Sequence, residues 1–311
     1  MSKYLTSETL IKSVKRRAMI PENQNTFLEE DFLSFANEEM DIGVVPHVLQ
    51  YHEEFFVYTQ NLPLVANVSR YQIPGRAVGN RLREIAYEDT SGNIFEMTRI
   101  TIEDLPLYQN NSTSARLRAF YIEGDEVVLV PDISSNPGGF LRASFYLRPN
   151  ELVTSSRVAI ITGIDRISGN ITVNQIPTNI SVTTPIDLVQ VKSPHRTLGL
   201  DLTAVSINTI TKTVTMNLTD IPTALGIGDQ IALAGESIVP QIPTDLHSML
   251  AQRVAARCLE ALGDANGLNA ANAKLQEMEI KTGSLIDNRV EGSPLKLVNR
   301  NGLLSASRRW R

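Results

Sequence analysis

The sequence comprises 311 residues, of which 42% are hydrophobic and 20% are charged. This balance is typical of a folded globular chain and excludes an intrinsically disordered one. No apolar run approaches the ~20 residues that span a bilayer. Residues 1–5 continue into the polar residues 6–8 without the apolar stretch of a signal peptide, so we expect no secretory signal and synthesis in the cytoplasm. Cys258 is the only cysteine, which excludes an intrachain disulfide and a cysteine-based metal cluster.

The net charge of −5 is unevenly distributed along the chain. Residues 288–311 contain six basic residues and one acidic residue, a net charge of +5. The rest of the chain contains 23 basic and 33 acidic residues, a net charge of −10. An acidic body with a basic tail predicts that the tail meets an acidic protein surface or nucleic acid.

The first sixty residues predict three helices. Ser7 is suited to cap the first helix, which ends before Pro21. A capping box at residues 26–29 predicts the start of the second helix. Gly43 interrupts that helix, and Pro46 suits the first turn of the third.

From residue 67 the sequence pattern changes to short apolar segments separated by turn signals, which is typical of β-strands. The predicted strands cover residues 71–74, 82–88, 94–100, 119–122, 127–130 and 141–147. None of the links between them is long enough for a helical crossover, so we expect the strands to be antiparallel.

Residues 154–240 contain an internal duplication, in which residues 164–174 parallel residues 207–217. Each copy alternates apolar residues with Thr, Asn or Ser, as half-buried hairpin strands do. The segment therefore predicts a small, barrel-like β-module inserted into a larger fold.

Helical periodicity returns in residues 241–287. Thr244 is suited to cap a helix that Gly263 ends. The second helix has apolar residues at steps of three and four, with a gap at Thr282; they are Leu268, Ala271, Leu275, Met278 and Leu285. This seam can pack on the N-terminal helices or on a neighbouring subunit, and packing within the chain is the simpler expectation.

The predicted fold class is therefore α+β. A discontinuous helical frame from both chain ends, residues 1–66 and 241–287, encloses an antiparallel β region at 67–153 and the β-module at 154–240. An extended basic docking tail, residues 288–311, completes the chain.

The sequence lacks the motifs of common catalytic and cofactor sites: it contains no phosphate-binding loop, no dinucleotide fingerprint and no serine nucleophile elbow. His47 and His52 are five residues apart, which places their rings on different sides of a helix rather than at the i, i+4 spacing of metal ligands. We therefore predict no enzyme, no cofactor and no metal site.

The tail carries the predicted interface. Its end, Arg308–Arg311, places the only tryptophan among three arginines, and Trp and Arg are the residue types that anchor interfaces. A solvated terminus is the alternative, but the tail has more apolar residues than solvation requires. The candidate interface residues are Arg289, Leu297, Arg300, Leu303, Leu304, Arg308, Arg309, Trp310 and Arg311.

Helices at residues 4–60 and 244–286 around a β-rich middle, followed by a basic tail, resemble the head-to-tail connector (adaptor, or ring) proteins of short-tailed phages. Residues 285–294, which run into 297–304, are similar to the tails of such proteins in crAss-like phages and their podovirus relatives. The resemblance implies a structural protein of the virion neck, a ring of twelve copies below the portal. It also implies a tail that clamps portal subunits, contacts with other neck and tail proteins, and a bore through which genomic DNA passes without specific binding.

Two other functions remain open at this point. A β-rich binding module of the tail, such as a fibre or carbohydrate-recognition component, is favoured by the β-module and its duplication but not by the helical frame. A cell-wall hydrolase has only scattered carboxylates in its favour.

Overall fold

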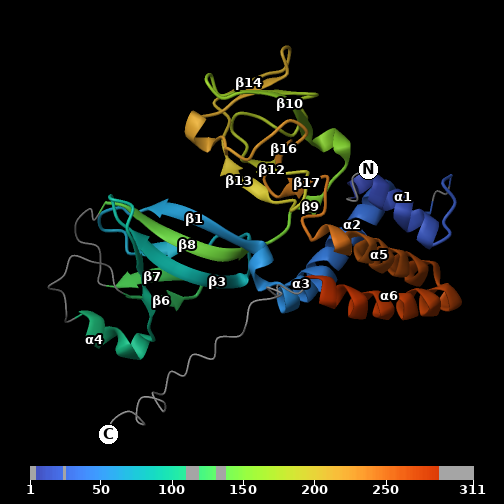
Figure 1. Cartoon of the computed structure of the whole chain (residues 1–311), viewed down its shortest axis with the longest axis horizontal. Coiled ribbons are helices and arrows are strands. Elements are labelled where there is room, and N and C mark those ends of the chain that lie inside the picture. Colours follow the sequence, from blue (N-terminus) through green and yellow to red (C-terminus); the bar gives the residue numbers. More distant parts are fainter. Residues whose placement is uncertain (1–4, 24–25, 110–118, 131–137, 287–311) are drawn as a thin grey trace, which may run out of the picture.

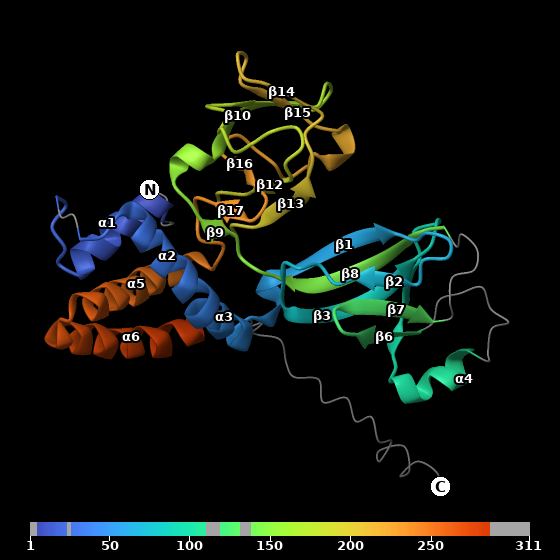
Figure 2. The ribbon, with the colours of Figure 1, turned by 180° about the vertical axis from the view of Figure 1, so that it is seen from behind.

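The computed structural model describes residues 5–23, 26–109, 119–130 and 138–286. Three parts meet at one junction: a helical frame, a pair of four-stranded sheets and the β-module (Figure 1). Figure 2 shows the same arrangement from behind, with the N-terminal and C-terminal helices side by side. The structure confirms the α+β class and the construction of one frame from both ends of the chain.

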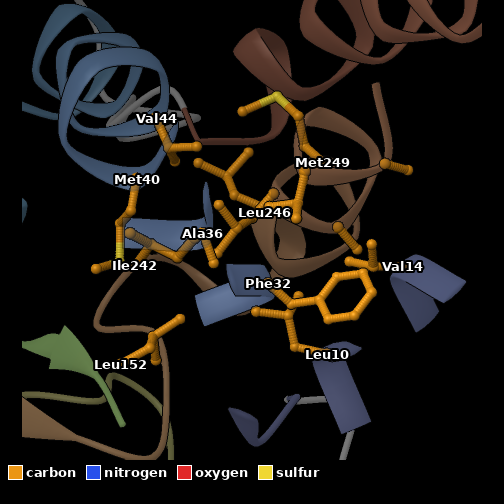
Figure 3. Close-up of a cluster of buried hydrophobic side chains, with 14 of the residues drawn as sticks. Leu10, Val14, Phe32, Ala36, Met40, Val44, Leu152, Ile242, Leu246 and Met249 are labelled. Carbon is orange, nitrogen blue, oxygen red and sulfur yellow. The ribbon is translucent and has the colours of Figure 1, made fainter. Parts of the chain in front are cut away.

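The helical frame consists of α1 (Ser7–Arg17), α2 (Glu29–Glu39), α3 (Val45–Tyr51), α5 (His247–Leu262) and α6 (Ala265–Ile286). Helices α1 and α2 both pack on α5, and α6 packs on α5 and α3. Figure 3 shows the core between them, where Leu10, Phe32 and Met249 are almost completely buried. Burial of one such side chain contributes about 1.5–3 kcal/mol, so this shared core holds the two chain ends together.

The starts of the first two helices differ from the sequence prediction. Thr6, not Ser7, caps α1, and its hydroxyl accepts a hydrogen bond from the Thr9 backbone N–H at 3.4 Å. The α2 helix starts after Leu28, whose N–H donates to the Asp31 carboxylate at 2.7 Å. The capping box was therefore predicted too early in the chain, at residues 26–29. The Asp31 carboxylate, in the first turn of α2, accepts the hydrogen bond of the Leu28 N–H, a backbone donor that has no partner within the helix.

Gly43 does not interrupt the helix but lies in a π-helical segment, Met40–Val44, that joins α2 to α3. A Cβ at this position would lie 2.5 Å from Nη1 of Arg253 in α5. The missing side chain thus allows an arginine of the neighbouring helix to lie against the backbone, and Pro46 occupies the first turn of α3 as predicted.

The sheet pair begins earlier than predicted, since β1 (Val57–Pro63) lies within the segment assigned to N-terminal helices. One sheet has the order β1-β8-β3-β4, with β8 at Phe140–Leu147, β3 at Ala77–Glu88 and β4 at Ile94–Glu96. The other has the order β2-β7-β6-β5, with strands at Arg70–Gln72, Glu126–Val130, Ala119–Glu123 and Thr98–Arg99. Ile85, Leu129 and Phe145 are buried in the core of this pair.

A short lobe that was not predicted follows β5. It consists of the 3-10 turn Ile102–Asp104 and the helix α4 (Leu105–Gln109). The sheet pair is antiparallel as expected, except that β5 pairs with β6 in parallel.

The β-module contains a seven-stranded sheet with the order β13-β12-β16-β10-β11-β15-β14. These strands are β10 (Ala159–Asp165), β11 (Asn170–Val173), β12 (Ile186–Val189), β13 (Thr197–Leu202), β14 (Ser206–Asn208), β15 (Thr213–Thr215) and β16 (Gln230–Leu233). The two duplicated segments form the hairpins β10–β11 and β14–β15. Within the described residues β13 and β14 do not pair with each other, so the module is an open sheet and the barrel-like closure was wrong.

The module joins the frame through a parallel pair, β9 (Glu151–Leu152) with β17 (Glu236–Ser237).

The C-terminal helices follow with two differences from prediction. Thr244 lies in a 3-10 turn, Thr244–Leu246, ahead of α5 rather than capping it. In α6, Leu285 is 67% exposed, whereas Thr282 is buried and its hydroxyl donates to the Met278 carbonyl at 2.8 Å. Gly263 ends α5 in the left-handed conformation, as expected.

Candidate functional site: the junction of the three parts

A buried polar network lies where the sheet pair meets the β-module. Arg76 precedes β3, Asn150 precedes β9 and Asp187 lies in β12. The Arg76 guanidinium is 2.8 Å from the Asp187 carboxylate, and its other terminal nitrogen donates to the Asn150 amide oxygen at 2.6 Å. The Asn150 amide nitrogen donates in turn to Asp187 at 2.9 Å. Each residue of the triad therefore contacts both others.

Asp187 is completely buried, and a buried carboxylate is costly unless it is paired and hydrogen-bonded. Besides Arg76 and Asn150, the backbone N–H groups of Asp201 and Gly235 both donate to it at 3.0 Å. These four donors come from four separate stretches of chain, and Arg76 and Asn150 lie outside the module. The carboxylate therefore fixes the position of the module relative to the sheet pair, because any rotation between them breaks several of its hydrogen bonds.

A second contact, between the module and the helical frame, is made by two histidines. His195 of the module and His247 of α5 have ring centroids 5.1 Å apart. His195 Nε2 is 3.1 Å from the Thr244 hydroxyl, and His247 Nδ1 accepts a hydrogen bond from the Leu5 N–H at 2.9 Å. Burial lowers the pKa of His247 to about 4, and burial also lowers the pKa of His195. Both rings are therefore uncharged at neutral pH.

An ion-pair network joins the helices of the frame. Arg253 of α5 lies between Glu39 of α2, at 3.2 Å, and Glu279 of α6. Arg257 contacts Glu38 at 3.0 Å and Glu39 at 2.7 Å. Arg253 and Glu39 are largely buried, so this network stabilises one helix arrangement more than isolated surface pairs do.

An apolar cleft opens beside the junction. Its floor contains Phe55, Phe56 and Leu147, and two exposed arginines, Arg148 and Arg196, lie at its rim. The cleft volume of about 50 Å³ is several times the ~10–15 Å³ that one water needs and far below the ~300–1,000 Å³ of small-molecule sites. A space of this size fits the end of one side chain.

The predicted tail interface, Arg289 to Arg311, lies outside the described residues. The last described residue, Ile286, is buried and lines a groove with His52, Phe55 and Pro243. The last described residue therefore lies beside the junction. His47 and His52 do not form a metal cluster, and no group of three or more His, Cys, Asp or Glu side chains that fits a metal occurs in the part of the chain that the structure describes.

The residues of the junction were not predicted from the sequence. Asp187 carried a signal, because it is a lone charge in the apolar run Ile186–Val189, a pattern that indicates a buried and paired group. No such pattern marks Arg76 or Asn150, since each lies in a polar loop like many others in the sequence. None of the described helices is long and apolar enough to cross a membrane.

The described polar centres join packed segments of the chain to one another. The sequence model of the SU10 adaptor protein family matches residues 6–169, more than half of the 311 residues. The chain belongs to this family and is therefore a structural adaptor protein of the phage head-to-tail neck. No curated protein matches the chain.

Proposed function

We propose that this adaptor forms a homo-oligomeric ring of twelve copies in the neck of a short-tailed, crAss-like bacteriophage. The ring joins the portal to the tail and lets genomic DNA pass, and the subunit is made in the host cytoplasm. The observation that carries the proposal is the family match over residues 6–169, which includes α1 to α3 and the whole sheet pair. Helices α5 and α6 belong to the same unit because they complete the core of α1 to α3.

Each segment has one role in this proposal. The helical frame of residues 1–56 and 241–287 and the sheet pair of 57–153 build the wall of the ring. The β-module of 154–240 projects from it (Figure 1). The tail of residues 288–311 docks on the portal or on another neck protein. Its 24 residues reach about 80 Å when fully extended, which is enough to touch a neighbouring ring.

The charge distribution supports transient contact with DNA. Outside the tail the chain has a net charge of −10, which repels phosphate. A chain that ends at Asp287 therefore has little DNA affinity at physiological salt. Mobility-shift measurements on this truncated chain and on the full chain test the point, and tight binding by the truncated chain would contradict it.

The tail proposal is tested by the same truncation after Asp287. We expect an unchanged thermal melt, because the described frame is complete without the tail, and a loss of co-purification with the portal. Light scattering on the full chain with portal measures the stoichiometry, and twelve copies per ring is the expected result. Undiminished portal binding by the truncated chain would contradict the tail as the docking element.

The second candidate function, a β-rich binding module of the phage tail such as a fibre or carbohydrate-recognition component, is favoured by one observation. The family match ends at residue 169, whereas the β-module continues to residue 240 around a core of its own. Its two duplicated hairpins expose Ile167 and Ile210 at their turns, at 89% and 92%. These two side chains, at matching positions of the duplicated hairpins, are available to contact a partner. Virion attachment to cells, compared between the full chain and an Ile167→Ser, Ile210→Ser double variant, separates the two functions.

A further inference from the structure

The lobe after β5 presents an apolar and acidic tip, which we call the arm (residues 101–109). Leu105 and Tyr108 hold it to the sheet pair, where they pack on Ile100 and Val130. Ile102, by contrast, is 61% exposed at the start of the arm. Figure 1 shows α4 standing at the end of the sheet pair that is remote from the helical frame. The arm is therefore an anchored projection with an exposed apolar side chain.

The charge of the arm is negative. Glu103, next to Ile102, is exposed, and Asp104 accepts a hydrogen bond from the Thr101 hydroxyl at 2.8 Å. This hydrogen bond fixes the turn that presents Ile102 and Glu103 together. The arm contains no basic residue.

The junction cleft has the complementary character. Its floor is apolar, and its rim carries Arg148 and Arg196. Arg196 is exposed and makes no ion pair with any residue in the described ranges, whereas Arg148 lies in the field of Asp41. Arginine beside an aromatic floor is a combination that commonly anchors protein interfaces.

We propose that the arm of one copy docks in the junction cleft of a second copy, with Ile102 in the cleft and Glu103 facing Arg196. The proposal rests on the proposed ring. The arm and the cleft lie at different places on one chain, so their contact is heterologous, and heterologous contacts form rings or filaments rather than closed dimers. Two features of the chain select a second copy as the occupant: the opposite charges of arm and rim, and a cleft volume that fits one side chain.

Disulfide trapping tests the contact. The only natural cysteine, Cys258, is buried and does not interfere. A full-length Ile102→Cys, Arg196→Cys double variant is oxidised mildly, alone and with portal. We expect a ladder of covalent multimers on a non-reducing gel, whereas each single variant gives dimers at most. The control pairs Ile210→Cys with Arg196→Cys, and no ladder is expected from it. Absence of the ladder from the first variant, both alone and with portal, overturns the proposal.

Charge reversal gives an independent readout. Glu103→Arg and Arg196→Glu, both at exposed positions, are each expected to weaken self-association at least tenfold with an unchanged melt. The double variant restores association to within about threefold, since the pair is exchanged rather than lost. Lys212→Glu, in an exposed turn of the module, is the control and changes nothing. Equal losses in the single and double variants would overturn the contact.

The same variants distinguish this contact from the portal adaptor role. If the portal co-purifies but no ladder forms, the arm contact is wrong and the proposed neck position is unaffected. A ladder without portal co-purification supports the arm contact and contradicts the proposed neck position.

Discussion

Arg76 and Asp187 lie 111 residues apart in the sequence, yet the Arg76 guanidinium is 2.8 Å from the buried Asp187 carboxylate. Arg76 belongs to the sheet pair and Asp187 to the β-module, so this pair sets how the two parts are oriented. Asn150, in the connection between them, hydrogen-bonds to both. The relative position of the module is thus decided by a single charged group and its donors.

Arg76→Ala is expected to lower the free energy of unfolding by about 3 kcal/mol, because it leaves a buried carboxylate without its cation. The loss lies at the lower end of the range for such pairs, since Asp187 keeps its hydrogen bonds from Asn150 and two backbone N–H groups. Denaturation with urea measures it. The control is Arg70→Ala, whose ion pairs with Glu123 and Glu126 are exposed to solvent, so its removal is expected to change the free energy of unfolding much less. Equal losses would show that the buried pair has no special role.

Substitution of two glycines of the β-module measures the cost of a steric clash apart from the cost of backbone strain. Gly169 and Gly228 both have positive φ, of 75° and 93°, so Ala costs about 1–2 kcal/mol at either position. A Cβ at Gly169 would lie 2.4 Å from the Met216 carbonyl oxygen, whereas a Cβ at Gly228 meets nothing within 4 Å. Gly169→Ala is therefore expected to lower the free energy of unfolding by at least ~1 kcal/mol more than Gly228→Ala does. Similar costs in calorimetry would contradict the close approach of the two hairpins.

The histidine contact predicts acid sensitivity. Burial lowers the pKa of His247 to about 4 in the folded protein, from ~6.5 in an unfolded chain. The unfolded state therefore binds more protons between these values, so stability falls as the pH drops from about 6.5 to about 4, by roughly 3 kcal/mol. The adjacent His195 lowers the pKa further, and hydrogen bonds to the Ile242 and Pro240 backbone offset only part of this lowering, so the sign is unchanged.

His247→Gln removes one titrating group from this window. Its slope of stability against pH, measured by denaturation at several pH values, is expected to be smaller than that of the unchanged chain. His52→Gln, at a partly exposed position, serves as the matched control for the loss of an imidazole. A slope that is the same in all three proteins would mean that the buried ring does not govern acid sensitivity.

The thiol of Cys258 is expected to be inert while the protein is folded. The side chain is completely buried in α5, and burial raises its pKa to about 11. Because the thiolate is the reactive form, a thiol reagent labels it only after the frame opens. Labelling at increasing urea, followed by mass spectrometry, is expected to coincide with unfolding. Fast labelling in buffer would show that α5 separates from its neighbours in the native state.

Replacement of residues 156–238 by a short Gly/Ser linker is expected to leave a helical frame that melts cooperatively. The module has its own core, and its removal exposes Arg76 to water rather than leaving it buried and unpaired. The two ends of the deleted segment are close, since β9 and β17 pair side by side. Calorimetry measures the transition, and its disappearance would show that the frame needs the module.

The sequence by itself determined the elements whose signals are local. The apolar stripes on the helices before residue 57 and after residue 246 required partners, and each set buries its stripe against the other. Period-two alternation in the duplicated segments identified both hairpins, and Gly263 marked the end of α5. These patterns succeed because hydrophobic periodicity reflects which face of an element is buried.

Only the tertiary structure decided how the parts are joined. The β1 strand was missed because its neighbour β8 lies about 80 residues further along the chain, and strand pairing rather than local propensity defines it. Sheet closure depends on whether β13 reaches β14, which no local pattern specifies. The junction is the clearest case: Asp187 stands out in sequence as a lone charge in an apolar run, but nothing local pairs it with Arg76 or Asn150. Burial of Asp187 and Asn150 makes these contacts costly to break, because water can no longer replace them.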